Sequence, residues 1–113
     1  MNVQNQLPLT ETTFFIILSL APGSKHGYAI MKEVETLSDN RVQLSTGTLY
    51  GALKRMLKGD WIERVEDLEF DDNSRGRKAY RLTKLGRRIL EAEMVRLRRL
   101  VDLGELRTEG KTI

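Results

Sequence analysis

The amino-acid sequence predicts a mainly α-helical fold with a small β-hairpin and a long C-terminal helix. Apolar residues recur at helical spacing in several segments, and two short runs rich in strand-forming residues lie between residues 61 and 82. The length of 113 residues fits one domain, or a small domain with one appended element. We therefore expect a domain over residues 1–83, a helix over residues 84–106 and a flexible tail over residues 107–113.

The first helix is expected to begin after Thr10, whose hydroxyl can cap it. Apolar residues nearly surround this segment, so a helix formed by it must be buried on two sides. One side can pack in its own core, and we expect the other to meet a second subunit. Phe14 and Phe15 are therefore candidate interface residues.

Two further helices are expected at residues 26–37, with Ser24 as a candidate cap, and at residues 45–59, where Ser45 can cap the first turn. The apolar stripe of the later helix consists of Leu49, Leu53 and Met56. Its other face is small, hydroxylated and basic, and residues 41–58 contain no acidic residue. A helix of this kind can enter a DNA major groove, although a solvated amphipathic helix has the same pattern.

Residues 61–66 and 78–82 predict two short strands joined by a long polar loop. Such a pair, placed directly after two helices with a short linker, predicts a winged helix-turn-helix. The loop is acidic at residues 66–72, but its end carries Arg75, Gly76, Arg77 and Lys78, which suit contacts with phosphates or a minor groove. The alternative is a loop whose charges only aid solubility.

The final helix is expected at residues 84–106, with Thr83 as its cap. Its apolar residues follow the 4-3-4 spacing of a coiled-coil seam, and we list them as candidate dimer residues: Leu90, Met94, Leu97 and Val101. A helix that projects beyond a small domain cannot bury such a seam alone. Pairing with a second subunit is the favoured interpretation, and docking on the first helix of the same chain is the alternative.

Several classes of protein are excluded by composition. The chain has no cysteine and one histidine, and its carboxylates form no cluster suited to a metal. The sequence contains neither a paired nucleophile and base nor a glycine-rich phosphate loop, the motifs that would indicate an enzyme. We therefore expect no catalysis and no cofactor. No apolar run approaches the length of a membrane span, and we expect a cytoplasmic protein without a membrane partner.

The net charge is only +3, but residues 75–99 are strongly basic, which favours a polyanionic partner. The candidate contacts to double-stranded DNA are Lys25, Gln43, Ser45, Thr46, Gly47, Thr48, Tyr50, Lys54, Arg55, Arg75, Gly76, Arg77 and Lys78. Tyr50 could equally be a half-buried packing residue. These features predict a dimeric DNA-binding regulator that reads a pseudo-palindrome. The alternative is a winged-helix protein-interaction module that uses the acidic loop as its contact surface.

The sequence also resembles the PadR family of bacterial transcriptional regulators over residues 9–90. The matching motifs are His26-Gly27-Tyr28, Ser45-x-Gly47-Thr48-Leu49-Tyr50-x-x-Leu53, Gly76-Arg77 and Tyr80-Arg81-Leu82-Thr83-x-x-Gly86. The resemblance implies a homodimer built through the first and last helices, repression by binding to an operator, and frequently a small-molecule effector such as a phenolic acid or a drug. The single C-terminal helix is similar to that of the shorter members. Two features depart from the family pattern, the acidic stretch before Arg75 and Ala79.

Overall fold

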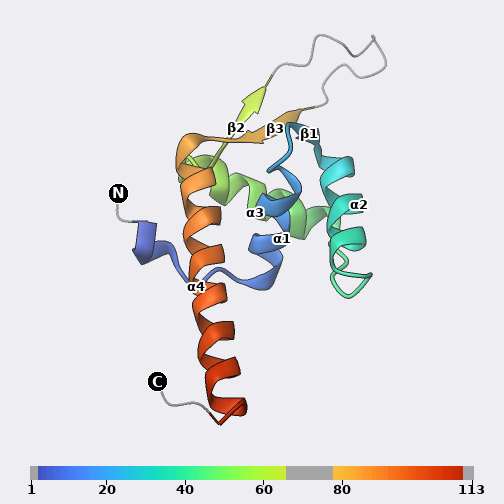
Figure 1. Cartoon of the computed structure of the whole chain (residues 1–113). Coiled ribbons are helices and arrows are strands. Elements are labelled where there is room, and N and C mark those ends of the chain that lie inside the picture. The colour runs from blue at the N-terminus through green and yellow to red at the C-terminus, as the bar shows by residue number, and fades with distance from the viewer. Residues whose placement is uncertain (1–2, 66–77, 111–113) are drawn as a thin grey trace.

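A computed structural model describes residues 3–65 and 78–110 of the chain. In these ranges it contains a short 3-10 helix, four α-helices and a three-stranded antiparallel sheet (Figure 1). The elements in chain order are η1 (Val3–Gln6), α1 (Glu11–Ser19), β1 (Lys25–His26), α2 (Gly27–Leu37), α3 (Thr46–Lys58), β2 (Ile62–Val65), β3 (Ala79–Leu82) and α4 (Lys84–Thr108). The predicted fold class, mainly helical with a small antiparallel sheet in a winged helix-turn-helix, is confirmed.

The sheet differs from the predicted hairpin in having a third strand. Its order is β1-β3-β2, and β1 pairs with β3 through Lys25 opposite Tyr80 and His26 opposite Ala79. Residue 26 was expected to open a helix, but α2 begins at Gly27 and His26 is its N-cap in place of the expected Ser24. The extended backbone of His26 serves both as a strand partner and as a helix cap, because an N-cap residue has β-region dihedral angles.

The N-cap residues of the other three α-helices are the ones predicted from the sequence. Thr10 accepts a hydrogen bond from the backbone N–H of Thr13 at 3.1 Å, and Ser45 accepts one from Thr48 at the same distance. Thr83 accepts one from Gly86 at 3.0 Å. Each hydroxyl satisfies a backbone donor that the first turn of a helix leaves without a partner.

The ends of α2 and α3 are also built alike. After α3 the backbone N–H of Trp61 donates to the carbonyl of Met56 at 2.9 Å, and the left-handed residue between them is Asp60, with φ of 63°. Asp39 occupies the same position after α2, with φ of 56°. The φ of Gly59 is −85°, so this glycine is not the left-handed residue, and a Cβ there would lie 3.2 Å from the indole nitrogen of Trp61. Gly59 therefore makes room for the indole.

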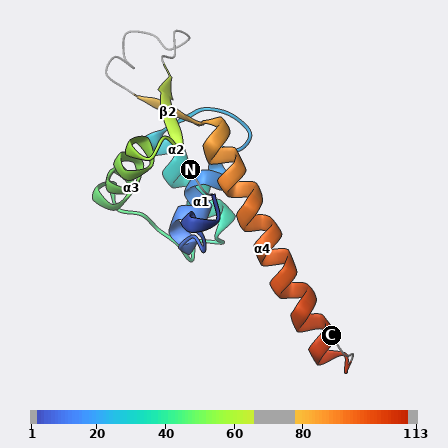
Figure 2. The ribbon, with the colours of Figure 1, turned by 90° about the vertical axis from the view of Figure 1, so that its left-hand side faces the viewer.

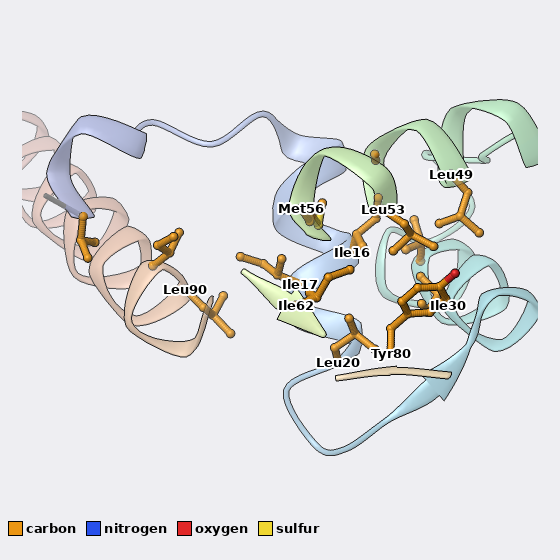
Figure 3. Packing of buried hydrophobic residues seen from close by; sticks show 14 residues of the cluster. Ile16, Ile17, Leu20, Ile30, Leu49, Leu53, Met56, Ile62, Tyr80 and Leu90 are labelled. Carbon is orange, nitrogen blue, oxygen red and sulfur yellow. The ribbon is translucent and has the colours of Figure 1, made fainter. Parts of the chain in front are cut away.

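The hydrophobic core joins all four α-helices and the sheet (Figure 3). Its largest fully buried apolar side chains are Ile16, Ile17, Leu20, Ile30, Val34, Leu49, Leu53, Ile62 and Ile89. Because Ile89 and Leu90 come from α4, the first turns of that helix complete the core of the winged helix. Gly86 allows this close packing, since a Cβ there would overlap the backbone carbonyl of Trp61.

A buried carboxylate holds the N-terminal segment against α4. Glu93 is only 2 % exposed, and its Oε2 accepts a hydrogen bond from the backbone N–H of Leu9 at 2.8 Å. Its Oε1 lies 2.5 Å from Nε of Arg96. The hydrogen bond from Arg96 lowers the pKa of Glu93 most, burial opposes this, and the N–H of Leu9 lowers the pKa further. As a result η1 and the segment after it lie beside α4 (Figure 1).

Beyond Glu93, α4 projects away from the rest of the molecule (Figure 2). It ends at Thr108, two residues later than the sequence indicated. Among residues 3–65 and 78–110 no helix is long and apolar enough to cross a membrane.

Candidate nucleic-acid interface

One side of α3 faces the core, and the other faces solvent. The buried side consists of Leu49, Ala52, Leu53 and Met56. With 100° between successive residues, Gly47, Gly51, Lys54 and Lys58 lie on the opposite side. A Cβ on Gly47 would meet no atom within 4 Å, and one on Gly51 would meet only the guanidinium of Arg55 at 3.8 Å. The outward face of α3 is therefore small and basic, and it is open to the close approach of a partner.

The cations of this face lack carboxylate partners in the described part of the chain, whereas several cations elsewhere have one. Lys54 and Arg55 form no ion pair with residues 3–65 or 78–110. By contrast, Arg41 in the linker before α3 pairs with Glu11 at the start of α1, and Arg81 pairs with Glu63 across the sheet at 2.6 Å. Unpaired cations at the surface can neutralise the charges of an anionic partner.

The polar groups at the start of α3 are arranged around its cap. The hydroxyl of Ser45 accepts from the backbone N–H of Thr48 and donates to the hydroxyl of Thr48 at 2.9 Å. Thr46 and Gly47 are exposed beside them. Gln43 is exposed as well, and its amide donates to the carbonyl of Asn40 at 3.4 Å. These predicted contact residues therefore form one continuous polar surface at the N-terminal end of α3.

Tyr50 combines the two roles that the sequence left open. Its ring lies over Gly27 at the start of α2, where a Cβ would be 2.9 Å from the ring carbon that bears the hydroxyl. The side chain is nevertheless 46 % exposed. The lack of a side chain at Gly27 thus makes room for the ring. Tyr50 packs the start of α2 against α3, and one edge of its side chain stays exposed to solvent. Gly27 and Tyr50 belong to two separate sequence motifs, and the sequence did not indicate that they touch.

Tyr80 connects this region to the wing. It is buried in β3 opposite Arg64 of β2, and Figure 3 shows its ring in the core beside Ile30. Burial raises the pKa of Tyr80, as does the nearby Tyr50, while a hydrogen bond and the positive charge of Arg64 lower it. The buried ring of Tyr80 therefore anchors the base of the wing in the core.

The remaining predicted DNA contacts lie around the wing. Lys25 is half-buried in β1, next to β3, and Lys78 is exposed just before β3. Arg75, Gly76 and Arg77 lie outside the described residues. Lys25 thus lies on the edge strand β1 and Lys78 directly before the central strand β3, and the acidic loop and the wing tip stay predictions.

The predicted dimer residues fall into two groups. Leu90 is 4 % exposed and belongs to the core of its own chain. Further along α4, Met94, Leu97 and Val101 are 49, 37 and 58 % exposed, and Val95 and Leu100 are exposed as well. Phe14 and Phe15 of α1 are partly buried and pack edge to face with their ring centres 6.1 Å apart. The uncovered apolar surface of the helix therefore begins at Met94.

Comparison with known proteins agrees with this arrangement. Residues 16–92 match the sequence profile of the transcriptional regulator PadR-like family. The chain belongs to this family. It is 34 % identical over 91 residues to an uncharacterised 37.1 kDa protein in transposon TN4556 of Streptomyces fradiae, and the match covers 80 % of this chain and 24 % of that protein. The chain thus spans about a quarter of the length of this relative.

Solved structures of other members have the same fold. A PadR family transcription regulator from Clostridium difficile R20291 superimposes with a TM-score of 0.68 and 27 % identity, over 83 % of this chain and 94 % of that one. PadR of Bacillus subtilis, solved in complex with operator DNA, gives a TM-score of 0.61 and 19 % identity, over 78 % and 49 % of the two chains. Because the identity to PadR of Bacillus subtilis is only 19 %, that likeness shows the fold alone.

Proposed function

We propose that this PadR-like protein is a cytoplasmic repressor that binds a pseudo-palindromic operator as a homodimer. The observation that carries the proposal is the outward face of α3, where unpaired cations and uncovered glycines replace the carboxylates and long side chains of an ordinary solvated helix. A small, positive helix face fits the width and charge of a major groove. The operator complex of Bacillus subtilis PadR supports the same use of the fold.

In this proposal the residues of the interface have different tasks. Lys54 and Arg55 neutralise phosphates, which contributes affinity without sequence preference. Thr46, Thr48 and the exposed edge of Tyr50 offer hydroxyl groups to base edges or phosphates. Lys25, Gln43 and Ser45 flank them, and the wing supplies Arg75, Gly76, Arg77 and Lys78.

The homodimer is proposed from the uncovered part of α4. Met94, Leu97 and Val101 continue the coiled-coil spacing on a helix that projects from its domain. A second copy of the chain would cover this surface, and Phe14 and Phe15 of α1 would lie at its border. We leave Leu90 out of the interface, because its side chain is already buried in the core. Two copies of α3 related by a twofold axis would then read half-sites one helical turn apart.

The test is fluorescence anisotropy with the DNA upstream of the gene and a scrambled duplex of the same length. We expect specific binding whose affinity falls with salt concentration. Lys54→Ala should weaken binding to both duplexes and reduce the slope of log affinity against log salt by about one unit. Lys32→Ala, which removes a charge from α2, should leave the slope unchanged. Equal affinity for both duplexes at every salt concentration would contradict the proposal.

A further inference from the structure

Arg64 is an exposed arginine at the base of the wing that the sequence did not indicate as a DNA contact. It stands opposite Tyr80 of β3, and Lys25 of β1 stands opposite Tyr80 on the other side. Residues directly opposite each other in a sheet project from the same face. The three side chains therefore form one row across the sheet, in which two cations flank a buried tyrosine.

The face of the sheet that carries this row is turned toward the helices. Ile62 lies two residues before Arg64 in β2 and projects from the same face, because side chains alternate along a strand. Both Ile62 and Tyr80 are buried in the core, and β2 packs directly against α3 (Figure 2). The long side chain of Arg64 therefore begins at the border of the core and ends in solvent, on the α3 side of the sheet.

The hydroxyl of Tyr80 holds the head of Arg64 in place. Because Tyr80 is buried, this hydroxyl needs a partner within the protein, and the guanidinium of Arg64 donates a hydrogen bond to it. A guanidinium has five donor hydrogens, and this hydrogen bond uses only one of them. The remaining donors can bind two oxygens of one phosphate group.

Arg64 and the neighbouring Arg81 differ in whether their charge is balanced within the chain. Arg81 projects from the opposite face of the sheet and pairs with Glu63 at 2.6 Å. Arg64 forms no ion pair with any residue in the two ranges that the structure describes. One arginine is therefore neutralised by its own chain, and the other keeps its charge for an anionic partner.

We propose that Arg64 binds a phosphate of the DNA backbone beside α3, and that the hydroxyl of Tyr80 positions its guanidinium for this contact. The inference rests on the proposed function, because it adds a contact to the same DNA interface. Lys25 and Arg64 then approach the backbone from the two edge strands of the sheet, on either side of Tyr80. Such a contact adds affinity and fixes the placement of the wing without reading the bases.

Fluorescence anisotropy with the upstream DNA and the scrambled duplex, over a range of salt concentrations, tests the phosphate contact. Arg64→Gln should weaken binding to both duplexes by about threefold to tenfold and reduce the slope of log affinity against log salt by about one unit. Arg64→Lys keeps the charge and should keep the slope. Arg81→Gln is the matched control, and it should leave the slope unchanged because the charge of Arg81 is already paired.

Tyr80→Phe tests the positioning role of the hydroxyl. This change leaves the charge of Arg64 in place, so we expect a loss of affinity of about threefold for both duplexes with an unchanged salt slope. In the Arg64→Gln background there is no guanidinium to position, so the same change should weaken binding no further. Thermal unfolding without DNA confirms that each variant is folded at the temperature of the assay.

The outcomes separate this inference from the proposed function. An unchanged slope in Arg64→Gln, together with a reduced slope in Lys54→Ala, would refute the phosphate contact alone. Equal losses from Tyr80→Phe in both backgrounds would refute the positioning role. Equal affinity of the unaltered protein for both duplexes would overturn the operator proposal, whereas the slopes would still decide the role of Arg64. If the protein bound neither duplex, both proposals would fail.

Discussion

Helices α3 and α4 are both amphipathic, but their exposed faces differ in kind. The main apolar residues of α3 are buried in the same chain, and the exposed remainder is largely small, polar and basic, apart from the exposed part of Tyr50. In α4 the apolar side chains are buried by the same chain only as far as Glu93. From Met94 onward several large apolar side chains are open to water.

This difference separates two kinds of partner. When the apolar side of a helix is already buried in its own chain, the helix needs no second subunit to cover it. If its outer side carries unpaired positive charge, that side suits a polyanion. A helix that leaves apolar side chains in water gains stability when another apolar surface covers them, because that burial is favourable in proportion to its area. The predictions that follow are arranged to test this division, beginning with the largest effect.

The two glycines inside α4 should respond in opposite ways to the same change. A Cβ on Gly86 would overlap the carbonyl of Trp61, whereas one on Gly104 would meet no atom within 4 Å. We expect Gly86→Ala to lower the free energy of unfolding by about 3 kcal/mol or more, because backbone atoms must move apart. Gly104→Ala should raise it by about 0.5–1 kcal/mol through its better helix propensity.

Urea unfolding at one protein concentration measures both variants. Equal effects of the two substitutions would contradict the division between a covered and an uncovered half of α4. A loss of stability in Gly104→Ala would instead show that another backbone approaches α4 closely at this position.

The uncovered half of α4 can be tested by a charge. Leu97→Asp should weaken dimerisation by about a hundredfold, or about 2.7 kcal/mol, because a carboxylate would have to leave water in each copy. Sedimentation velocity over a range of concentrations measures the association. Arg88→Asp, which lies on the domain-bound half and is already exposed, should keep the mass of the unaltered protein. An unchanged dimer mass in Leu97→Asp would argue against this surface.

The boundary between the two halves is set by Glu93. Its folded pKa lies below the ordinary value, so the carboxylate stabilises the fold above the unfolded pKa near 4.3, and this contribution is lost as the pH falls through the folded pKa. Glu93→Gln keeps the shape but loses the charge paired with Arg96. We expect it to lower the free energy of unfolding at neutral pH by about 1.5–3 kcal/mol.

Urea unfolding between pH 2 and pH 7 distinguishes this role from packing alone. The stability difference between Glu93→Gln and the unaltered protein should shrink as the pH falls below about 4. A difference that stayed constant with pH would mean that the charge of Glu93 contributes nothing.

The smallest expected change in stability concerns the C-terminal ends of α3 and α4. After α4 the left-handed position is occupied by Gly110, with φ of 74°, but after α3 it is occupied by Asp60. A residue with a Cβ is less favourable there than glycine, so Asp60→Gly should raise the free energy of unfolding by about 0.5–1 kcal/mol. Thermal unfolding measures the gain, and a loss would mean that the Asp60 side chain stabilises the turn.

The sequence predicted features that depend on neighbours along the chain. The capping hydroxyls of Thr10, Ser45 and Thr83 were recognised because a cap and its partner are three residues apart. Strand β1 was missed because it is two residues long and is defined only by its pairing with β3. Such a short segment has no alternation of its own.

In the candidate site, too, the sequence predicted local features but not contacts between distant segments. The polar, basic face of α3 could be read from helical spacing. The contact between Tyr50 and Gly27 could not, because it depends on how two helices cross. Nothing in the sequence distinguishes Glu93 from the other charged residues of its helix, because its partner Leu9 is 84 positions away in the chain. A glycine at the first position of one helix, with a tyrosine on the polar side of the next helix, is a sequence signal that could have suggested the first contact.

The burial of Ile89 and Leu90 also bears on how the protein is made. During synthesis α3 leaves the ribosome before α4, yet the core that holds α3 in place lacks one wall until α4 has been added. The contact between Leu9 and Glu93 closes the N-terminal segment onto the structure only after that. We infer that an unfinished chain cannot present a correctly placed α3. A nascent or truncated copy that lacks the first turns of α4 would therefore be unable to occupy an operator.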